Sequence, residues 1–385
     1  TLSQVFEVQH FRKLGKTSPE SGAVYSVESG SALEIIINGE VAVEHGTLKN
    51  DAERAFYGVG IFIHIGVYAC LGTHPFGNSS VLTLDLQAQY IYYYEEIRRL
   101  LTQGGSWLYS WKRTLGGEFM GIVAYYGASP LNIIFALFPK DRIADAMMTI
   151  QLFKVGFMGL TFGYYIHKTR FVSQMHTIAF SLMYALCAYS VVQLANPMWL
   201  DAMIFLPLLI LGLEALINER KFILYTASLT MIFITNYYIG YMCGIFTFFY
   251  FLYYYSLKRD DLMYKGEEKI SLFKTYGFRT FMRFAFFTLI SLLIAAFMLI
   301  AAYYSLTFGK SGFSNPSYSF SLRFDFLDLI VKLLPGSYDS VRPTGLPMIY
   351  SGLLALIAIP LYYMSPAITK KQKVCASMQI GRAHV

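Results

Sequence analysis

The sequence predicts an all-α polytopic membrane protein with about eight spans and a long first outer loop that carries interfacial helices. The 385 residues are 55% hydrophobic and only 14% charged, whereas soluble domains carry about 25% charged residues. The apolar residues also gather in continuous runs of about 20, the length that crosses a bilayer core as a helix. A membrane β-barrel would show short alternating runs instead.

The predicted domain organisation has three parts. Residues 1–54 form a polar N-terminal segment of uncertain origin, residues 55–366 form the transmembrane domain, and residues 367–385 form a cytoplasmic tail. In the N-terminal segment, Asn38-Gly39 between two short apolar runs indicates a β-hairpin.

Eight apolar segments are long enough to be membrane spans. They are Ala55–Gly72, Ala144–His167, Met175–Leu194, Leu200–Ile217, Phe222–Tyr238, Tyr241–Leu257, Phe284–Phe308 and Pro347–Met364. A ninth apolar segment, Phe119–Phe138, is interrupted by Gly121, Gly127 and Pro130. We interpret it as re-entrant or interfacial, with a full span as the alternative.

The distribution of Lys and Arg predicts which turns face the cytoplasm, because cytoplasmic loops of membrane proteins are rich in these residues. Basic residues occur in the turns His167–Ser173, Asn218–Lys221 and Lys258–Arg283. The turns Asn196–Asp201 and Thr235–Tyr241 contain none. This pattern predicts a cytoplasmic N-terminus and places two large loops, Thr73–Arg142 and Gly309–Leu346, on the outer face.

The first outer loop contains a segment, Ala88–Leu101, with the pattern of a helix that lies in the membrane interface. One helical stripe is apolar, and the charged residues Glu95, Glu96, Arg98 and Arg99 lie off it. The stripe consists of Tyr90, Ile91, Tyr94, Ile97 and Leu101. Gly104-Gly105 is expected to end this helix.

Asp85 is the candidate catalytic residue. It lies just after the first span, where a partly desolvated carboxylate would have a raised pKa and would suit a general base. The alternative is that Asp85 only caps the helix that follows, because Asp is favoured at that position.

Five further residues are candidates for binding a substrate or its phosphate. Arg342 lies in a Pro/Gly-rich turn before the last span and could hold a phosphate with two hydrogen bonds, or it could pair with Asp339. Tyr338 lies in the same turn. Lys332 could bind a phosphate or extend to the membrane surface. Trp199 and Asp201 could position a sugar, or serve as a belt residue and a helix cap.

Several functions are disfavoured by the sequence. The net charge of +7 reflects basic turns between spans, so nucleic-acid binding is not expected. No phosphate-binding loop, metal-ligand spacing or paired-cysteine motif occurs. A substrate that is already activated, with no cofactor and no obligatory metal, is therefore expected.

Several runs resemble the bacterial YfhO family in consistent order from about Tyr57 to Met364. They are HPFGNSSVLTLDLQAQY, SWLYSW, SPLNIIFALFP, NPMWLDAMIFLPLLILG, TNYYIGYM and YDSVRPTGLPMIYSGLLAL. The family belongs to the GT-C class of integral membrane glycosyltransferases. Its members are linked to the addition of sugars to lipoteichoic or other teichoic-type envelope polymers, with an undecaprenyl-phosphate-linked sugar as donor.

The resemblance implies a GT-C-like helix bundle with an essential acidic residue in the first outer loop, which matches Asp85. It also implies that a basic residue of a late outer loop, here Arg342, holds the lipid phosphate. Family members are longer, so we expect this chain to be truncated. Its last residues, from Gln379 on, resemble a translated sequencing adaptor.

The resulting hypothesis is an inverting transfer from the lipid-linked donor to a polymer hydroxyl, with Asp85 as the base. A transporter or flippase of lipid-linked precursors is the alternative, and a non-catalytic scaffold is a third possibility. Transporters tend to carry ionisable residues inside their spans. The spans of this chain read as nearly free of charge, which favours chemistry at the outer surface.

Overall fold

The computed structural model describes residues 25–29, 32–37, 40–41, 45–113, 115–169, 173–263, 276–309, 327–336 and 349–382. The chain divides into two compact units, Thr1–Ala55 and Phe56–Val385. The first contains a three-stranded antiparallel sheet, with strands β1 (Tyr25–Ser29), β2 (Ala32–Ile37) and β3 (Glu40–Val41). Ile37 pairs with Glu40, which confirms the hairpin predicted around residues 38–39.

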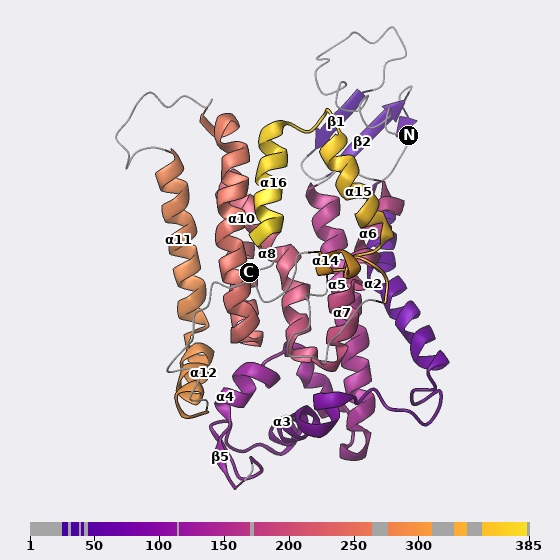
Figure 1. Cartoon of the computed structure of the whole chain (residues 1–385), viewed down its shortest axis with the longest axis vertical. Coiled ribbons are helices and arrows are strands. Elements are labelled where there is room, and N and C mark those ends of the chain that lie inside the picture. Colours follow the sequence, from indigo (N-terminus) through magenta and orange to yellow (C-terminus); the bar gives the residue numbers. More distant parts are fainter. Residues whose placement is uncertain are drawn as a thin grey trace. The chain divides into compact units, whose positions relative to one another are not determined.

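The second unit is an all-α bundle (Figure 1). Among the described residues, three helices are long and apolar enough to cross a membrane, and two bent helix pairs raise this number to five. Shorter apolar helices add to them. The main helices are α2 (His45–Cys70, which begins in the first unit), α5 (Ile143–Thr169), α6 (Gln174–Ala185), α7 (Ala188–Val192), α8 (Leu200–Asn218), α9 (Ile223–Thr235), α10 (Tyr237–Met263), α11 (Tyr276–Ile294), α12 (Ala296–Gly309) and α15 (Leu353–Met364). The prediction of an all-α polytopic membrane protein is confirmed.

Two predicted spans have a different form in the structure. The segment 175–194 is bent by 45° between α6 and α7. The segment 284–308 is not one helix: α11 begins earlier, at Tyr276, and ends at Ile294, and α12 follows after Ala295. Hydrophobicity alone did not reveal either break, because both sides of each break are apolar.

The first large loop covers one end of the bundle, which we call the loop end (Figure 1). It contains a π-helical turn η1 (Leu86–Tyr90), α3 (Ile91–Gln103), the two-stranded pair β4 (Tyr109–Ser110) and β5 (Gly117–Glu118), and the short helix α4 (Met120–Ile122). A second π-helical turn η2 (Val123–Gly127), and the 3₁₀ segments η3 (Pro130–Leu137) and η4 (Lys140–Arg142) complete it.

The apolar segment between Phe119 and Phe138 bends sharply. Met120–Gly127 and Pro130–Leu137 meet at 97°, at the positions where Gly127 and Pro130 interrupt the sequence. Asn132 secures the corner, because its Nδ2 donates to the carbonyl oxygen of Gly127 at 2.9 Å. This bend agrees with the re-entrant interpretation of the segment, and a broken span has the same form.

The helix α3 begins and ends near the predicted positions, and Tyr90, Ile91, Tyr94 and Ile97 of the predicted stripe are buried. Gly104 has a φ of 75° and ends the helix, as expected for a residue that tolerates this conformation. Leu100 is buried, whereas Leu101 is exposed and lines a pocket. Glu96, predicted to lie off the apolar stripe, is buried instead.

The helices α8 and α9 form the most closely packed part of the bundle. A Cβ added to Gly212 would lie 2.4 Å from the backbone nitrogen of Tyr225, so only glycine permits this approach.

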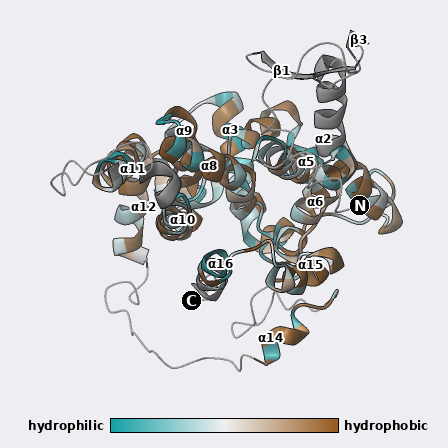
Figure 2. Ribbon diagram, turned by 90° about the horizontal axis from the view of Figure 1, so that it is seen from above, coloured by the Kyte–Doolittle hydropathy of each residue, from teal (hydrophilic) through white to brown (hydrophobic). Residues whose placement is uncertain are grey.

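Smaller elements lie at the periphery: α14 (Asp328–Val331) is separate from the helices of the loop end, and the hydrophilic α16 (Lys370–Arg382) lies beside α10 (Figure 2).

Candidate functional site

Asp85 lies on the surface of the loop end, immediately before the turn η1. The preceding residue, Leu84, has a φ of 51°, a backbone conformation that bulky residues rarely adopt and that tends to occur at functional sites. The Asp85 side chain makes no capping hydrogen bond to the helix. The structure therefore gives no support to the alternative that Asp85 serves only as a helix cap.

Tyr90 is the hydrogen-bond partner of Asp85. Its hydroxyl donates to Oδ2 at 3.3 Å, and no other hydrogen bond to the carboxylate is found among the described residues. Burial raises the pKa of Tyr90, and the neighbouring Tyr126 and Asp85 raise it further, so the hydroxyl keeps its proton and remains a donor. Oδ1 of Asp85 is left open to another group.

The two π-helical turns meet beside Asp85. Tyr90, from η1, and Tyr126, from η2, have ring centroids 4.9 Å apart. π-Helical turns are rare and occur frequently at functional sites. Tyr126 also contacts Tyr93 and Tyr125, with centroids at 5.1 and 4.6 Å.

The tyrosine cluster continues to the turns between the spans. Tyr125 contacts Tyr237 and Tyr238 at the start of α10, with centroids 5.6 and 6.4 Å away. We call Tyr90, Tyr93, Tyr125, Tyr126, Tyr237 and Tyr238 the tyrosine cluster. It joins the first loop to the turn between α9 and α10, where Asn236 Nδ2 donates to the Tyr125 carbonyl oxygen at 2.8 Å.

Trp199 packs against the same hydrophobic core as Tyr125 and Tyr126. Its indole Nε1 is buried and has no hydrogen-bond partner within bonding geometry. The structure thus brings two predicted residues, Asp85 and Trp199, to one aromatic cluster.

Asp201 has a very different environment. It is 1% exposed, and so is Lys154 from the middle of α5. Lys154 Nζ lies 2.5 Å from Asp201 Oδ2 and donates to the Pro197 carbonyl oxygen at 2.9 Å. Ser129, at the corner of the bent segment, donates to Asp201 Oδ1 at 2.7 Å. Both oxygens of this buried carboxylate are hydrogen-bonded within the protein, so Asp201 is placed to hold the bend rather than to contact a sugar directly.

The spans are not free of charge, contrary to the sequence-based expectation. Besides the Lys154–Asp201 pair, Glu214 in α8 is buried and accepts hydrogen bonds from Tyr165 at 3.0 Å and Tyr250 at 2.6 Å. An ionisable residue inside a span is itself a signal of a functional or structural site. Lys154, alone in the apolar run of its span, was the available signal that the sequence reasoning missed.

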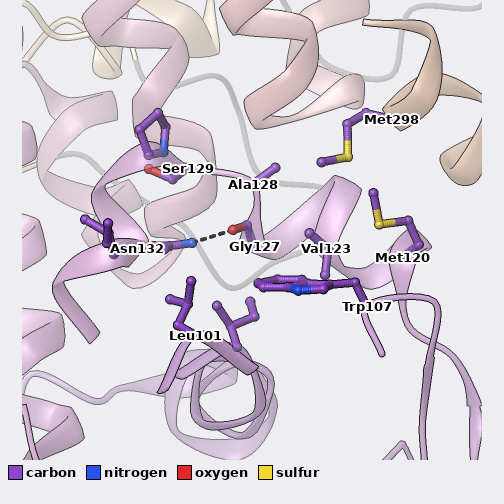
Figure 3. A pocket seen from close by; sticks show the side chains of 12 residues that line it. Leu101, Trp107, Met120, Val123, Gly127, Ala128, Ser129, Asn132 and Met298 are labelled. Carbon is purple, nitrogen blue, oxygen red and sulfur yellow. Dashed lines mark hydrogen bonds between the residues drawn. The ribbon is translucent and has the colours of Figure 1, made fainter. Parts of the chain in front are cut away.

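An apolar pocket of about 450 Å³ lies between α3, the bent segment and α12. Figure 3 shows the Trp107 indole across one side, with Leu101, Val123, Met120 and Met298 around it. Ser129 is one of its few polar lining residues. The pocket is therefore bordered by the residue whose hydroxyl donates to Asp201.

Two ion-paired carboxylates stabilise the fold of the first loop. Hydrogen bonds from Arg99 lower the pKa of Glu96, and burial raises it by a smaller amount. A hydrogen bond from Ser110 and the charge of Lys112 lower the pKa further. Burial alone would raise the pKa of Glu118, but hydrogen bonds from Ser305, the Gly121 backbone and Arg113 outweigh it and lower the pKa. Since Ser305 belongs to α12, Glu118 ties the β4–β5 pair to the bundle.

The other predicted binding residues are Arg342, Tyr338 and Lys332. Arg342 and Tyr338 lie outside the described residues. Lys332 is half-buried at the end of α14, and α14 lies apart from α3 in both views (Figures 1 and 2). Among the described residues, no three His, Cys, Asp or Glu side chains gather as metal ligands.

Fold and site together define an integral membrane protein with a polar, tyrosine-rich site on one end of an apolar helix bundle. The chain belongs to the family described as bacterial membrane protein YfhO, whose family model matches residues 57–380. No curated protein and no solved structure matches the chain.

Proposed function

We propose that this protein is a glycosyltransferase that moves a sugar from a polyprenyl-phosphate donor, of the undecaprenyl-phosphate type, to a hydroxyl of a cell-envelope polymer. The acceptor is of the lipoteichoic or teichoic type, and the loop end faces the outside of the bacterial plasma membrane. The observation that carries the proposal is the exposed Asp85 carboxylate at the edge of the tyrosine cluster. Carboxylates bind and deprotonate hydroxyls, and aromatic rings offer flat apolar faces on which sugar rings pack.

The proposed reaction is a single displacement with inversion. Asp85 Oδ1, which is open, accepts the proton of the acceptor hydroxyl as its oxygen bonds to the anomeric carbon. The bond from that carbon to the phosphate oxygen breaks, and polyprenyl phosphate leaves with the electron pair. Tyr90 orients Asp85 through Oδ2.

The donor lipid fits the apolar parts of the same end. The pocket between α3, the bent segment and α12 has a volume within the range of small-molecule sites, and it accommodates part of a polyprenyl chain. Arg342 remains our candidate for stabilising the negative charge that grows on the leaving phosphate, and Lys332 is a second candidate. We propose that no cofactor and no obligatory metal takes part.

The test uses the full chain in proteoliposomes with a labelled polyprenyl-phosphate sugar and an acceptor polymer. Asp85→Asn should reduce transfer by about 10²- to 10⁴-fold, the usual contribution of a general base, with unchanged folding. Glu219→Gln is the matched control, because Glu219 is an exposed carboxylate in the turn between α8 and α9. Normal transfer by Asp85→Asn would refute the assignment of the base.

A transporter or flippase of lipid-linked precursors is the second candidate. Glu214, a buried carboxylate inside α8 that is held by two tyrosine hydroxyls, favours it, because such groups line ion and proton paths in transporters. The same proteoliposomes separate the candidates. Movement of the labelled lipid between leaflets without transfer of sugar would establish the second function. The absence of both movement and transfer would indicate a scaffold.

A further inference from the structure

A second pocket, of about 340 Å³, lies where the loop after α2 meets the beginning of α5. Polar side chains from both segments line it. The six on which the inference depends are His74, Ser79, Ser80, Asp141, Arg142 and Asp145. We call it the His74 pocket. None of these residues takes part in the proposed chemistry at Asp85.

The His74 ring is held in one orientation by groups far away in the sequence. Its Nδ1 lies 2.7 Å from Asp145 Oδ1, and because a carboxylate only accepts, we assign the proton to Nδ1. Arg142 binds the other oxygen of Asp145 at 3.3 Å. In the neutral ring, Nε2 is then a free acceptor, and no partner for it is found among the described residues.

The backbone around His74 is also fixed. The His74 nitrogen donates to the Ser79 carbonyl oxygen, and the Ser79 nitrogen donates to the Gly72 carbonyl oxygen, both at 2.9 Å. A Cβ on Gly77 would lie 2.5 Å from the Gly72 oxygen. The loop is therefore closed on itself, yet the His74 side chain is 46% exposed. A rigid loop that presents an oriented and accessible imidazole is a preorganised binding element.

The charges of the pocket decide which ligand it suits. Arg142 contributes one positive charge and Asp141 and Asp145 contribute two negative charges, so these three groups have a formal sum of −1. This sum disfavours a phosphate or another anion. The pocket lining contains donors, from Arg142 and the serine hydroxyls, together with acceptors, from Asp141 and His74 Nε2. Hydroxyl groups match such a mixture because each both donates and accepts.

We propose that the His74 pocket binds a neutral, hydroxyl-rich unit, either a polyol or a sugar residue, of the acceptor polymer. This inference rests on the proposed transfer reaction and names where its acceptor is held. Val81 lines the pocket, and Asp85 follows it by four residues, a stretch of at most about 14 Å. A polymer unit held at His74 thus leaves a neighbouring unit within reach of Asp85.

The kinetic test compares variants of the full chain in the transfer assay. His74→Ala and Asp145→Asn should raise the KM for the acceptor at least ten-fold and leave the KM for the donor and kcat nearly unchanged. His176→Ala is the control, because His176 is also exposed and bonded through Nδ1, to Ser173 Oγ at 2.6 Å. A collapse of kcat with an unchanged acceptor KM would overturn the inference, because His74 would then act on the reacting atoms.

The binding test needs no activity. Diethyl pyrocarbonate modifies an accessible imidazole nitrogen, and peptide mass spectrometry follows His74 and His176 separately. Glycerol or methyl glucoside should slow the modification of His74 at least five-fold but not that of His176, and inorganic phosphate at the same concentration should have no effect. Protection by phosphate alone, or by no probe, would overturn the inference. Protection by polyols in a protein that transfers no sugar would refute only the proposed function.

Discussion

The two aspartates of the loop end, Asp85 and Asp201, occupy opposite environments. Asp85 is exposed and has one hydrogen bond, from Tyr90. Asp201 is buried and meets Ser129 and the charged Lys154. A buried charge is tolerated only when it is paired and hydrogen-bonded, so the partners of Asp201 satisfy it and leave nothing for a substrate. The comparison teaches that the exposed carboxylate keeps an oxygen open to another group, whereas the buried one is held by partners within the protein.

Breaking the buried pair should have the largest effect on stability. Lys154→Met leaves Asp201 as an unpaired buried charge, which costs about 3–5 kcal/mol. We expect a clear fall in the midpoint of thermal unfolding in detergent. The double variant Lys154→Met/Asp201→Leu should recover most of the loss, because an apolar pair of similar size replaces the ion pair. An unchanged midpoint for the single variant would mean that the pair does not stabilise the bundle.

Ser129→Ala should have the next largest effect. It removes the hydrogen bond to Asp201 Oδ1 and leaves one buried acceptor less satisfied, at a cost of about 1–3 kcal/mol. Ser181→Ala is a suitable control, since that buried serine only donates to the carbonyl oxygen of Thr177, in its own helix. Equal destabilisation by the two variants would contradict a special role for Ser129 at the bend.

Tyr90→Phe tests the exposed side of the comparison. It removes the one donor to Asp85 and keeps the ring in the tyrosine cluster. Transfer should fall about five-fold, which corresponds to about 1 kcal/mol for one hydrogen bond, with little change in unfolding. Tyr93→Phe serves as the control, because its hydroxyl accepts from Gln89 and not from the aspartate. A larger fall in Tyr93→Phe would show that the Tyr93 hydroxyl, rather than the hydrogen bond from Tyr90 to Asp85, determines activity.

The smallest effect should come from pH. The pKa of Glu96 lies below the ordinary value of 4.5, so the folded state favours the charged form. Its contribution to stability is present above pH 4.5 and is lost as the pH falls from there through the lowered pKa. Unfolding midpoints measured from pH 7 to pH 3.5 should therefore decline more for the wild type than for Glu96→Gln. Parallel curves would show that Glu96 does not contribute to this dependence.

The sequence predicted the features that depend on local composition. Apolar length predicted the spans, Gly104 predicted the end of α3, and Gly127 with Pro130 predicted the interrupted segment, because chain flexibility and hydrophobicity act over a few residues. Asp85 was selected from its place after the first span. That selection, like those of Arg342 and Lys332, stays a prediction.

The features that the sequence did not predict depend on distant partners. Lys154 and Asp201 are 47 residues apart, and His74 and Asp145 are 71 apart, so no local pattern joins them. The π-helical turns that bring Tyr90 to Tyr126 follow from packing between two segments, which no spacing rule encodes. The lone Lys154 in an apolar run was the exception, since the cost of burying a charge implies a hidden partner.

The short helix α9 has a consequence for the surrounding lipid. It has 13 residues and is therefore about 20 Å long, which is less than the hydrocarbon thickness of about 30 Å. A helix shorter than the bilayer makes the lipids around it thin locally or admits water at its end. In this protein Asn236, which follows α9, is buried and donates to the Tyr125 carbonyl oxygen, so the first loop, rather than thinned lipid, covers this end of the short helix.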